Sequence, residues 1–150
     1  MKIECVNKNL YTIYINKYYY QFRKETINEC ITKILLILKK IYNIEVYSEF
    51  IVKCYINNTY GIILEIERKY DPFSLYTKKT NLEIYYYKDS VFLYEIEDYF
   101  VKNKLNNYKL YLYDNKYYIK LIDEDDLSII EFSNKILYGD TINKIINNSD

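Results

Sequence analysis

The chain has 150 residues; half of them are apolar and 28% are charged, with 21 Lys and Arg against 21 Asp and Glu. This balance excludes an intrinsically disordered chain, and the length allows one medium domain or two small ones. The sequence contains no His, two Gly and one Pro. It therefore excludes a glycine-rich phosphate loop, and any zinc site or acid–base catalyst that depends on His.

Composition and cysteines indicate a cytoplasmic protein. No run of 18 apolar residues occurs, so no membrane partner is expected. Cys5, Cys30 and Cys54 are widely spaced and each lies in an apolar run, which predicts three buried thiols in a reducing cytosol. Ile, Lys, Asn and Tyr make up more than half of the chain, and their AT-rich codons indicate an AT-rich genome.

Residues 1–70 begin with a predicted hairpin. Polar and apolar residues alternate over 2–6 and again over 10–15, which is the period of a β-strand. Between them, Asn7-Lys8-Asn9 is a turn signal. The two segments are therefore expected to pair as antiparallel strands.

A long helix is predicted over 24–42. Its apolar side chains recur at helical spacing along one face, at Ile27, Ile31, Ile34, Leu35, Leu38, Ile41 and Tyr42. Extended segments follow at 45–56 and 62–67, on either side of a turn that contains Gly61. We therefore expect a ββαββ unit, with one helix across a four-stranded antiparallel sheet.

A linker is predicted at 71–81, which holds the only Pro and shows no periodicity. The charge balance changes sign across it. Residues 1–71 hold 11 Lys and Arg against 8 Asp and Glu, and residues 72–150 hold 10 against 13. The opposite signs suit two units that attract each other or face different partners, although numbers this small also arise by chance.

Residues 82–150 predict a second α+β unit. Its expected elements are extended segments at 82–87 and 90–94, a short helix at 96–105, and a tyrosine-rich hairpin at 108–113 and 116–122. The acidic run 123–126 then predicts the start of a helix that continues to about Leu137. This run lacks the spacing of a calcium loop, so no metal or other cofactor is expected.

The hairpin provides the candidate partner-binding residues. Side chains alternate along a strand, so Leu110 and Leu112 share one face and Tyr111 and Tyr113 the other. We expect the leucines to be buried, which leaves the tyrosines exposed as candidate hot spots. The alternative is that they only shield the sheet backbone. The full candidate set is Tyr111, Tyr113, Tyr117 and Tyr118.

The sequence predicts neither an enzyme nor a nucleic-acid-binding protein. No Ser lies in a nucleophile elbow, and no pair of carboxylates is distinguished by its spacing. The 22 Tyr could stack bases, but a net charge of zero provides no basic groove. Another protein is therefore the expected partner.

Two segments resemble the MecA family of adaptor proteins. Residues 1–9, Met-Lys-Ile-Glu-Cys-Val-Asn-Lys-Asn, resemble the opening of that family, and the strand–helix–hairpin order after them is similar. Residues 110–121, Leu-Tyr-Leu-Tyr-Asp-Asn-Lys-Tyr-Tyr-Ile-Lys-Leu, resemble the hairpin of its C-terminal domain. The chain departs from the family at Asn115, which replaces a turn Gly, and after Gly139, where the family continues with another helix and strand.

The resemblance implies an adaptor without bond chemistry of its own. In that family the N-terminal domain takes a target protein and the C-terminal domain binds a ClpC-type AAA+ unfoldase. The second hypothesis is a small phage, viral or immunity-type protein that binds and blocks a partner protein. The oligomeric state stays open.

Overall fold

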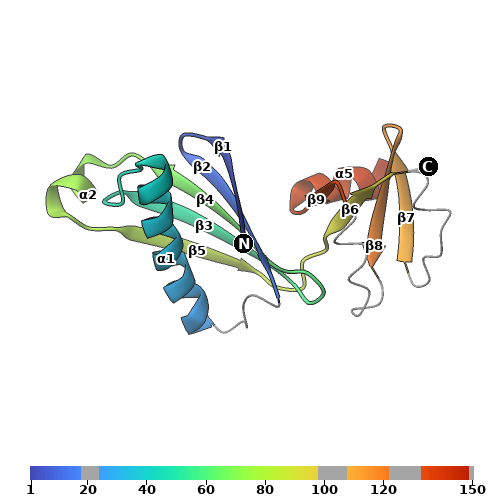
Figure 1. Cartoon of the computed structure of the whole chain (residues 1–150), viewed down its shortest axis with the longest axis horizontal. Helices are drawn as coiled ribbons and strands as arrows, with labels where there is room; N and C mark the ends of the chain where they lie inside the picture. Colours follow the sequence, from blue (N-terminus) through green and yellow to red (C-terminus); the bar gives the residue numbers. More distant parts are fainter. Residues whose placement is uncertain (18–23, 98–107, 122–132, 149–150) are drawn as a thin grey trace. The chain divides into compact units, whose positions relative to one another are not determined.

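The computed structural model describes residues 1–17, 24–97, 108–121 and 133–148 (Figure 1). Its helices and strands confirm the predicted α+β class, with one sheet of five strands and one of four. The chain divides into two compact units. The first comprises Met1–Cys54 and Ile62–Tyr86, and the second comprises Tyr55–Gly61 and Tyr87–Asp150.

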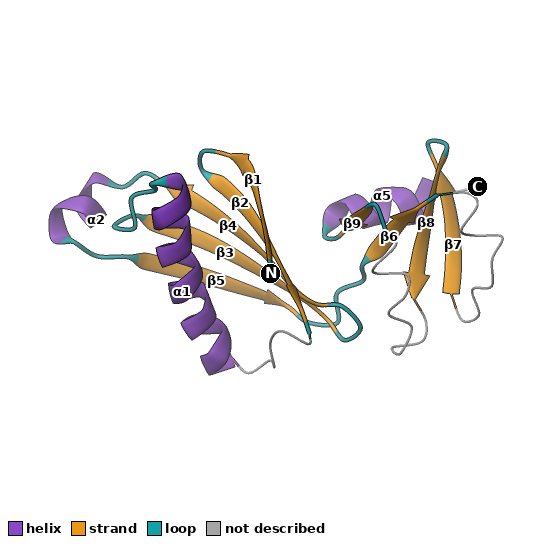
Figure 2. Ribbon diagram, viewed as in Figure 1, coloured by secondary structure: helices purple, strands orange, loops and turns teal. Residues whose placement is uncertain are grey.

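The first unit contains a five-stranded sheet and two helices (Figure 2). In chain order its elements are β1 (Lys2–Asn7), β2 (Leu10–Asn16), α1 (Lys24–Tyr42), β3 (Glu49–Asn57), β4 (Gly61–Lys69), α2 (Pro72–Thr77) and β5 (Asn81–Tyr87). The strand order is β1-β2-β4-β3-β5. The predicted ββαββ order is confirmed, and α2 and β5 extend it. Residues 71–81 thus lie within the first unit, where we had expected a linker.

β5 departs from the expected antiparallel sheet. It neighbours β3, and the Asn81 N–H donates to the Ser48 carbonyl, just before the start of β3, at 3.1 Å. Both strands therefore begin at the same end of the sheet and run parallel. Parallel neighbours need a connection that crosses back along the sheet, and β4 and α2 provide it.

α1 supplies the core of the first unit from one apolar face. Ile31, Ile34 and Leu38 are fully buried, as the helical spacing predicts. Ile41 and Tyr42 were expected on the same face but are exposed. The helix ends here, because Asn43 takes a left-handed φ of 54°.

The second unit contains a four-stranded sheet and a C-terminal helix. Its elements are β6 (Leu93–Ile96), β7 (Tyr108–Tyr113), β8 (Lys116–Leu121), β9 (Lys135–Leu137) and α5 (Asp140–Asn148), with strand order β7-β8-β6-β9. The predicted hairpin is confirmed as β7 and β8. The sequence-based helices at 96–105 and from 123 onward fall largely on 98–107 and 122–132, outside the described residues.

Two predicted helix ends are wrong, because both are strands. Ile96 closes β6, and residues 135–137 form β9, which pairs antiparallel with β6 through Tyr94 and Ile136. Helical spacing of apolar residues is a weak signal over so few residues, and pairing with a neighbouring strand outweighs it. Buried Ile142 and Ile145, three residues apart, form the inner face of α5.

The three cysteines differ in environment. Cys54 is buried and Cys30 is half-buried, but Cys5 is exposed, so the expectation of three buried thiols is wrong for Cys5. Cys5 lies on β1, an edge strand of the sheet. Within the described residues, no helix is long and apolar enough to cross a membrane.

Candidate protein-binding surface

The β7–β8 hairpin closes with a two-residue turn. Asp114 and Asn115 both take left-handed backbone angles, with φ of 50° and 61°. Two such residues are typical of the type I′ turn, whose twist matches that of paired strands. Asn tolerates this conformation, which explains how Asn115 forms this turn without Gly. Tyr111 then pairs with Tyr118, and Leu110 with Ile119.

The structure buries the tyrosine face of this hairpin, which was expected to be exposed. Tyr111 and Tyr118 are only 6% and 7% exposed, whereas Leu110 is 37% exposed. The two tyrosines form a core cluster with Leu93, Ile142 and Ile145. The expected exposure of Tyr111 is therefore wrong, because α5 packs on the tyrosine face and an amphipathic Tyr ring suits such a half-apolar layer.

The other two candidates are half-buried. Tyr113 packs against the same cluster, and Tyr117 lies on the opposite face of the hairpin, across from Leu112. Burial raises the pKa of the Tyr118 phenol, and the nearby Glu95 raises it further. The hairpin tyrosines are thus mainly core residues, and Tyr111 and Tyr118 offer a partner almost no surface.

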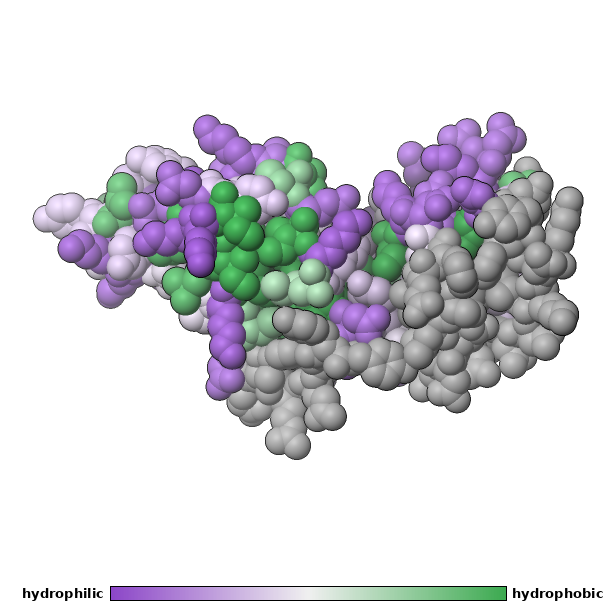
Figure 3. Space-filling view, viewed as in Figure 1, coloured by the Kyte–Doolittle hydropathy of each residue, from purple (hydrophilic) through white to green (hydrophobic). Residues whose placement is uncertain are grey.

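A different set of aromatic side chains is exposed, around α2. Tyr70 is 73% exposed, Phe73 75%, Leu75 46% and Tyr76 88%. We call these four residues the α2 surface. α2 is labelled toward the left in Figure 1, and the same end of Figure 3 shows pale, green and purple side chains. Exposed apolar side chains that gather on one element mark a candidate interaction site.

Hydrogen bonds hold α2 firmly in place. Asp71 caps the helix: one carboxylate oxygen accepts from the Phe73 N–H at 3.0 Å and the other from the Ser74 hydroxyl at 2.9 Å. At the other end Lys78 takes a left-handed φ of 54°, and its N–H donates to the Leu75 carbonyl at 3.3 Å. The helix is short, but both of its ends are satisfied.

Further bonds join α2 to the sheet. The Asn81 side-chain amide donates to the Ser74 hydroxyl at 3.2 Å, and Ser74 is buried. The Thr80 hydroxyl donates to the Val46 carbonyl at 2.7 Å. Hydrogen bonds therefore fix the backbone that carries the α2 surface, and Ser74 points inward.

Three lysines flank the α2 surface along the chain. Lys69 precedes it and Lys78 and Lys79 follow it, and all three are exposed. Asp71 is the one acidic residue between 68 and 80, and both of its carboxylate oxygens accept hydrogen bonds within the chain. An acidic partner thus complements this region electrostatically.

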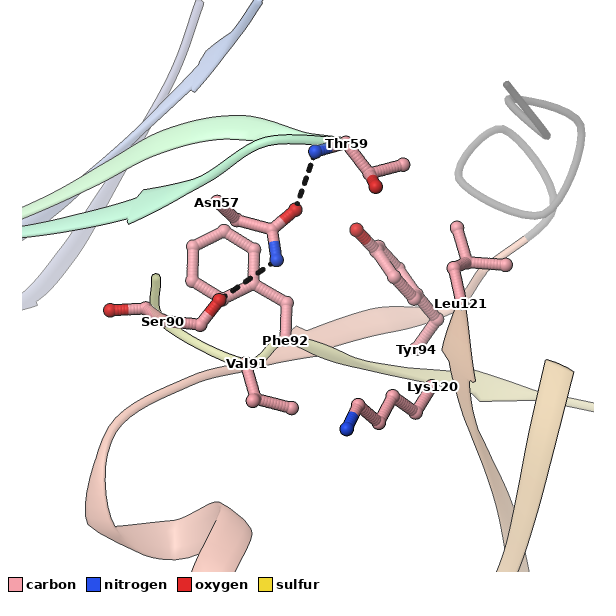
Figure 4. Close-up of a pocket in the computed structure, with 8 residues that line it drawn as sticks. All are labelled: Asn57, Thr59, Ser90, Val91, Phe92, Tyr94, Lys120 and Leu121. Atoms are coloured by element: carbon pink, nitrogen blue, oxygen red, sulfur yellow. Dashed lines mark hydrogen bonds between the residues drawn. The ribbon is translucent and has the colours of Figure 1, made fainter. Parts of the chain in front are cut away.

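The second unit contains a small, partly open cavity beside Asn57 (Figure 4). The Asn57 side chain accepts from the backbone N–H groups of Thr59 and Tyr60, each at 2.9 Å, and donates to the Ser90 carbonyl at 2.9 Å. These bonds close the β3–β4 turn and join it to the segment before β6. The cavity has a volume of about 60 Å³, room for one or two water molecules.

Tyr94 points its hydroxyl toward Thr59 in this cavity (Figure 4). Its hydroxyl is buried and has no hydrogen-bond partner among the described residues. Burial raises the pKa of Tyr94 well above its ordinary value. An unsatisfied buried hydroxyl costs stability, and a water molecule in this cavity would provide it with a partner.

Comparisons with protein-family models, with curated proteins and with solved structures found no match. In the described part of the chain, no group of three or more acidic or Cys residues is placed to hold a metal ion. The exposed α2 surface is accordingly the strongest candidate site that the structure presents.

Sequence reasoning missed the α2 surface because it treated 71–81 as a linker. A signal was present: Tyr70, Phe73, Leu75 and Tyr76 place four large apolar residues within seven positions. They follow neither a strand nor a helix period for long enough to predict a buried face.

Proposed function

We propose that the chain is a non-enzymatic adaptor of the cytoplasm that binds another protein through the α2 surface. The observation that carries this proposal is the exposure of Tyr70, Phe73 and Tyr76 on a hydrogen-bonded frame. Tyr and other aromatic residues are enriched among the hot spots of protein interfaces. A frame that already fixes the backbone reduces the entropy lost on binding.

The resemblance to the MecA family supports a second partner, a ClpC-type unfoldase. An adaptor needs two surfaces that act together, and a chain of two compact units suits that requirement. The first unit would hold the target protein and the second the unfoldase. Tethering the target then raises its local concentration at the unfoldase without any bond chemistry in the adaptor.

The first test compares three forms of the chain by affinity purification from the native cell. Phe73→Ser with Tyr76→Ser removes the centre of the α2 surface. Leu36→Ser with Ile41→Ser is the matched control, because both side chains are exposed on α1. The expected result is that wild type and the control retain the same partner, whereas the α2 variant loses it. Equal retention by all three would remove the α2 surface from the account.

The second test uses a purified ClpC-type unfoldase. Binding and stimulated ATP hydrolysis at micromolar protein support the adaptor function. If neither occurs, the adaptor function is contradicted. A partner from the native cell that the chain binds and inhibits would then establish the alternative, a blocking protein.

A further inference from the structure

The outer edge of β5 is open in the described part of the sheet. β5 is the last strand in the order β1-β2-β4-β3-β5, with β3 as its neighbour. Asn81 directs its N–H to the β3 side. Backbone groups alternate in direction along a strand, so those of Leu82 and Ile84 point to the open edge. An edge of this kind can pair with an extended segment of another chain.

The two edges of the sheet differ in how they resist such pairing. β1, at the opposite edge, has an irregularity in its pairing between Cys5 and Asn7 and carries Lys2 and Glu4. Bulges and charges are the usual means of blocking an edge. β5 reads Asn-Leu-Glu-Ile-Tyr-Tyr-Tyr, with one charged residue and no Pro. Its side chains at Leu82 and Tyr85 are exposed.

The open edge continues directly from the α2 surface. Only residues 78–80 separate the end of α2 from the start of β5. The Asn81 bond to Ser74 fixes the start of β5 against the helix. Lys78 and Lys79 lie in this junction and are exposed. Hydrogen-bonding backbone, aromatic side chains and positive charge are thus adjacent in one stretch of the first unit.

We propose that the edge of β5 binds an extended, acidic segment of an unfolded protein as a sixth strand. The backbone groups of Leu82 and Ile84 recognise extended main chain of any sequence. The α2 surface contacts the apolar side chains of the segment, and Lys78 and Lys79 favour acidic ones. This inference rests on the proposed function, because it specifies the class of target that the adaptor would take.

The test measures how tightly the full chain binds a permanently unfolded acidic protein, reduced and carboxymethylated α-lactalbumin. Leu82→Pro removes an outward N–H and places a ring at the edge, while proline is tolerated at this position of an edge strand. Leu82→Ala is its matched control, because it shortens the same side chain but keeps the N–H. Circular dichroism and the thermal midpoint verify that each variant is folded.

Micromolar binding is expected for wild type and for Leu82→Ala, with affinity about ten-fold weaker for Leu82→Pro, a difference of about 1.4 kcal/mol. Lys78→Gln with Lys79→Gln provides a second variant that leaves β5 unchanged. It is expected to weaken binding and to reduce its salt dependence. Reduced, carboxamidomethylated lysozyme, unfolded but basic, is expected to bind more weakly than the acidic probe.

Three results would overturn the inference: no binding of the acidic probe to wild type, equal binding by Leu82→Pro and Leu82→Ala, or equal binding of the acidic and basic probes. Sedimentation of the chain alone gives a further check. A dimer that Leu82→Pro abolishes would show that a second copy occupies the edge, which also contradicts the inference.

The unfoldase measurement separates this inference from the proposed function. Binding to the ClpC-type unfoldase without binding to the unfolded probe would overturn the inference and leave the adaptor function in place. Edge-dependent binding of the probe without any unfoldase binding would support the inference and contradict the adaptor function.

Discussion

Leu38 and Leu36 lie two positions apart on α1 but are expected to contribute very differently to the free energy of unfolding. Leu38 is fully buried beneath α1, and Leu36 is exposed on the same helix. Truncating a buried Leu loses its transfer free energy and leaves a cavity, so Leu38→Ala is expected to lower the free energy of unfolding by about 2–5 kcal/mol.

The measurement is urea unfolding of both single variants. Leu36→Ala is expected to change the free energy of unfolding by less than about 0.5 kcal/mol, the range of surface sites. A small loss at Leu38, equal to that at Leu36, would contradict the assignment of the helix face.

Buried titratable groups predict a loss of stability at alkaline pH. Burial raises the pKa of Tyr60 from 10.0 to about 12. Burial likewise raises the pKa of the Cys54 thiol from 9.0 to about 12, with Cys30 contributing. These groups lose their protons at a lower pH in the unfolded chain than in the folded chain. Their contribution to the free energy of unfolding is therefore fully present below pH 9 and is lost as the pH rises toward 12.

Tyr60→Phe isolates one of these groups. It is expected to reduce the loss of stability between pH 10 and 12 and to leave the remaining loss to the other buried groups, Cys54, Tyr94 and Tyr118. Urea unfolding across this range, with the same variant near neutral pH as reference, provides the measurement. An identical pH profile for variant and wild type would show that Tyr60 ionises as freely in the folded chain as in the unfolded one.

At the scale of elements, the β7–β8 hairpin allows a test of the burial of its tyrosine face. Tyr111 is buried against α5 residues, and Leu110 is partly exposed on the other face. Tyr111→Ser is therefore expected to destabilise the second unit by roughly 3–5 kcal/mol, as for loss of a large aromatic side chain. Leu110→Ser is expected to cost much less, because its side chain already meets solvent.

Amide hydrogen exchange reads out this prediction within the second unit. The expected result for Tyr111→Ser is faster exchange in β7 and β8, with little change in α1. Unchanged protection in the hairpin would restore Tyr111 as a surface residue and a candidate for partner binding.

The same hairpin shows what sequence patterns predict and what they leave open. Alternation over 108–113 fixed the strand, but not which of its two faces is buried. That choice depended on α5, where Ile142 and Ile145 supply the covering surface. The bounds of α1 were predictable because helical spacing recurs along the segment, although Ile41 and Tyr42 at its end are exposed. β9, with three residues, depends on its pairing with β6.

At the scale of the whole molecule, the sequence predicted two units, but the structure divides the chain at other residues than the predicted linker. Tyr55–Gly61, at the end of the β3–β4 hairpin, belongs to the second unit, and β5 belongs largely to the first. Such exchanges depend on contacts between distant residues, such as the Asn57 bond to Ser90. The linker was predicted from local composition, which does not indicate contacts between distant residues.

One measurement tests the central claim, that the chain is an adaptor acting through the α2 surface. The measurement is the degradation, by a ClpC-type unfoldase with its peptidase, of the partner protein that affinity purification recovers, with and without the chain. Wild type and Leu36→Ser/Ile41→Ser are expected to accelerate degradation at micromolar concentration, whereas Phe73→Ser/Tyr76→Ser does not. No acceleration by the wild-type chain, or equal acceleration by all three, would contradict the claim.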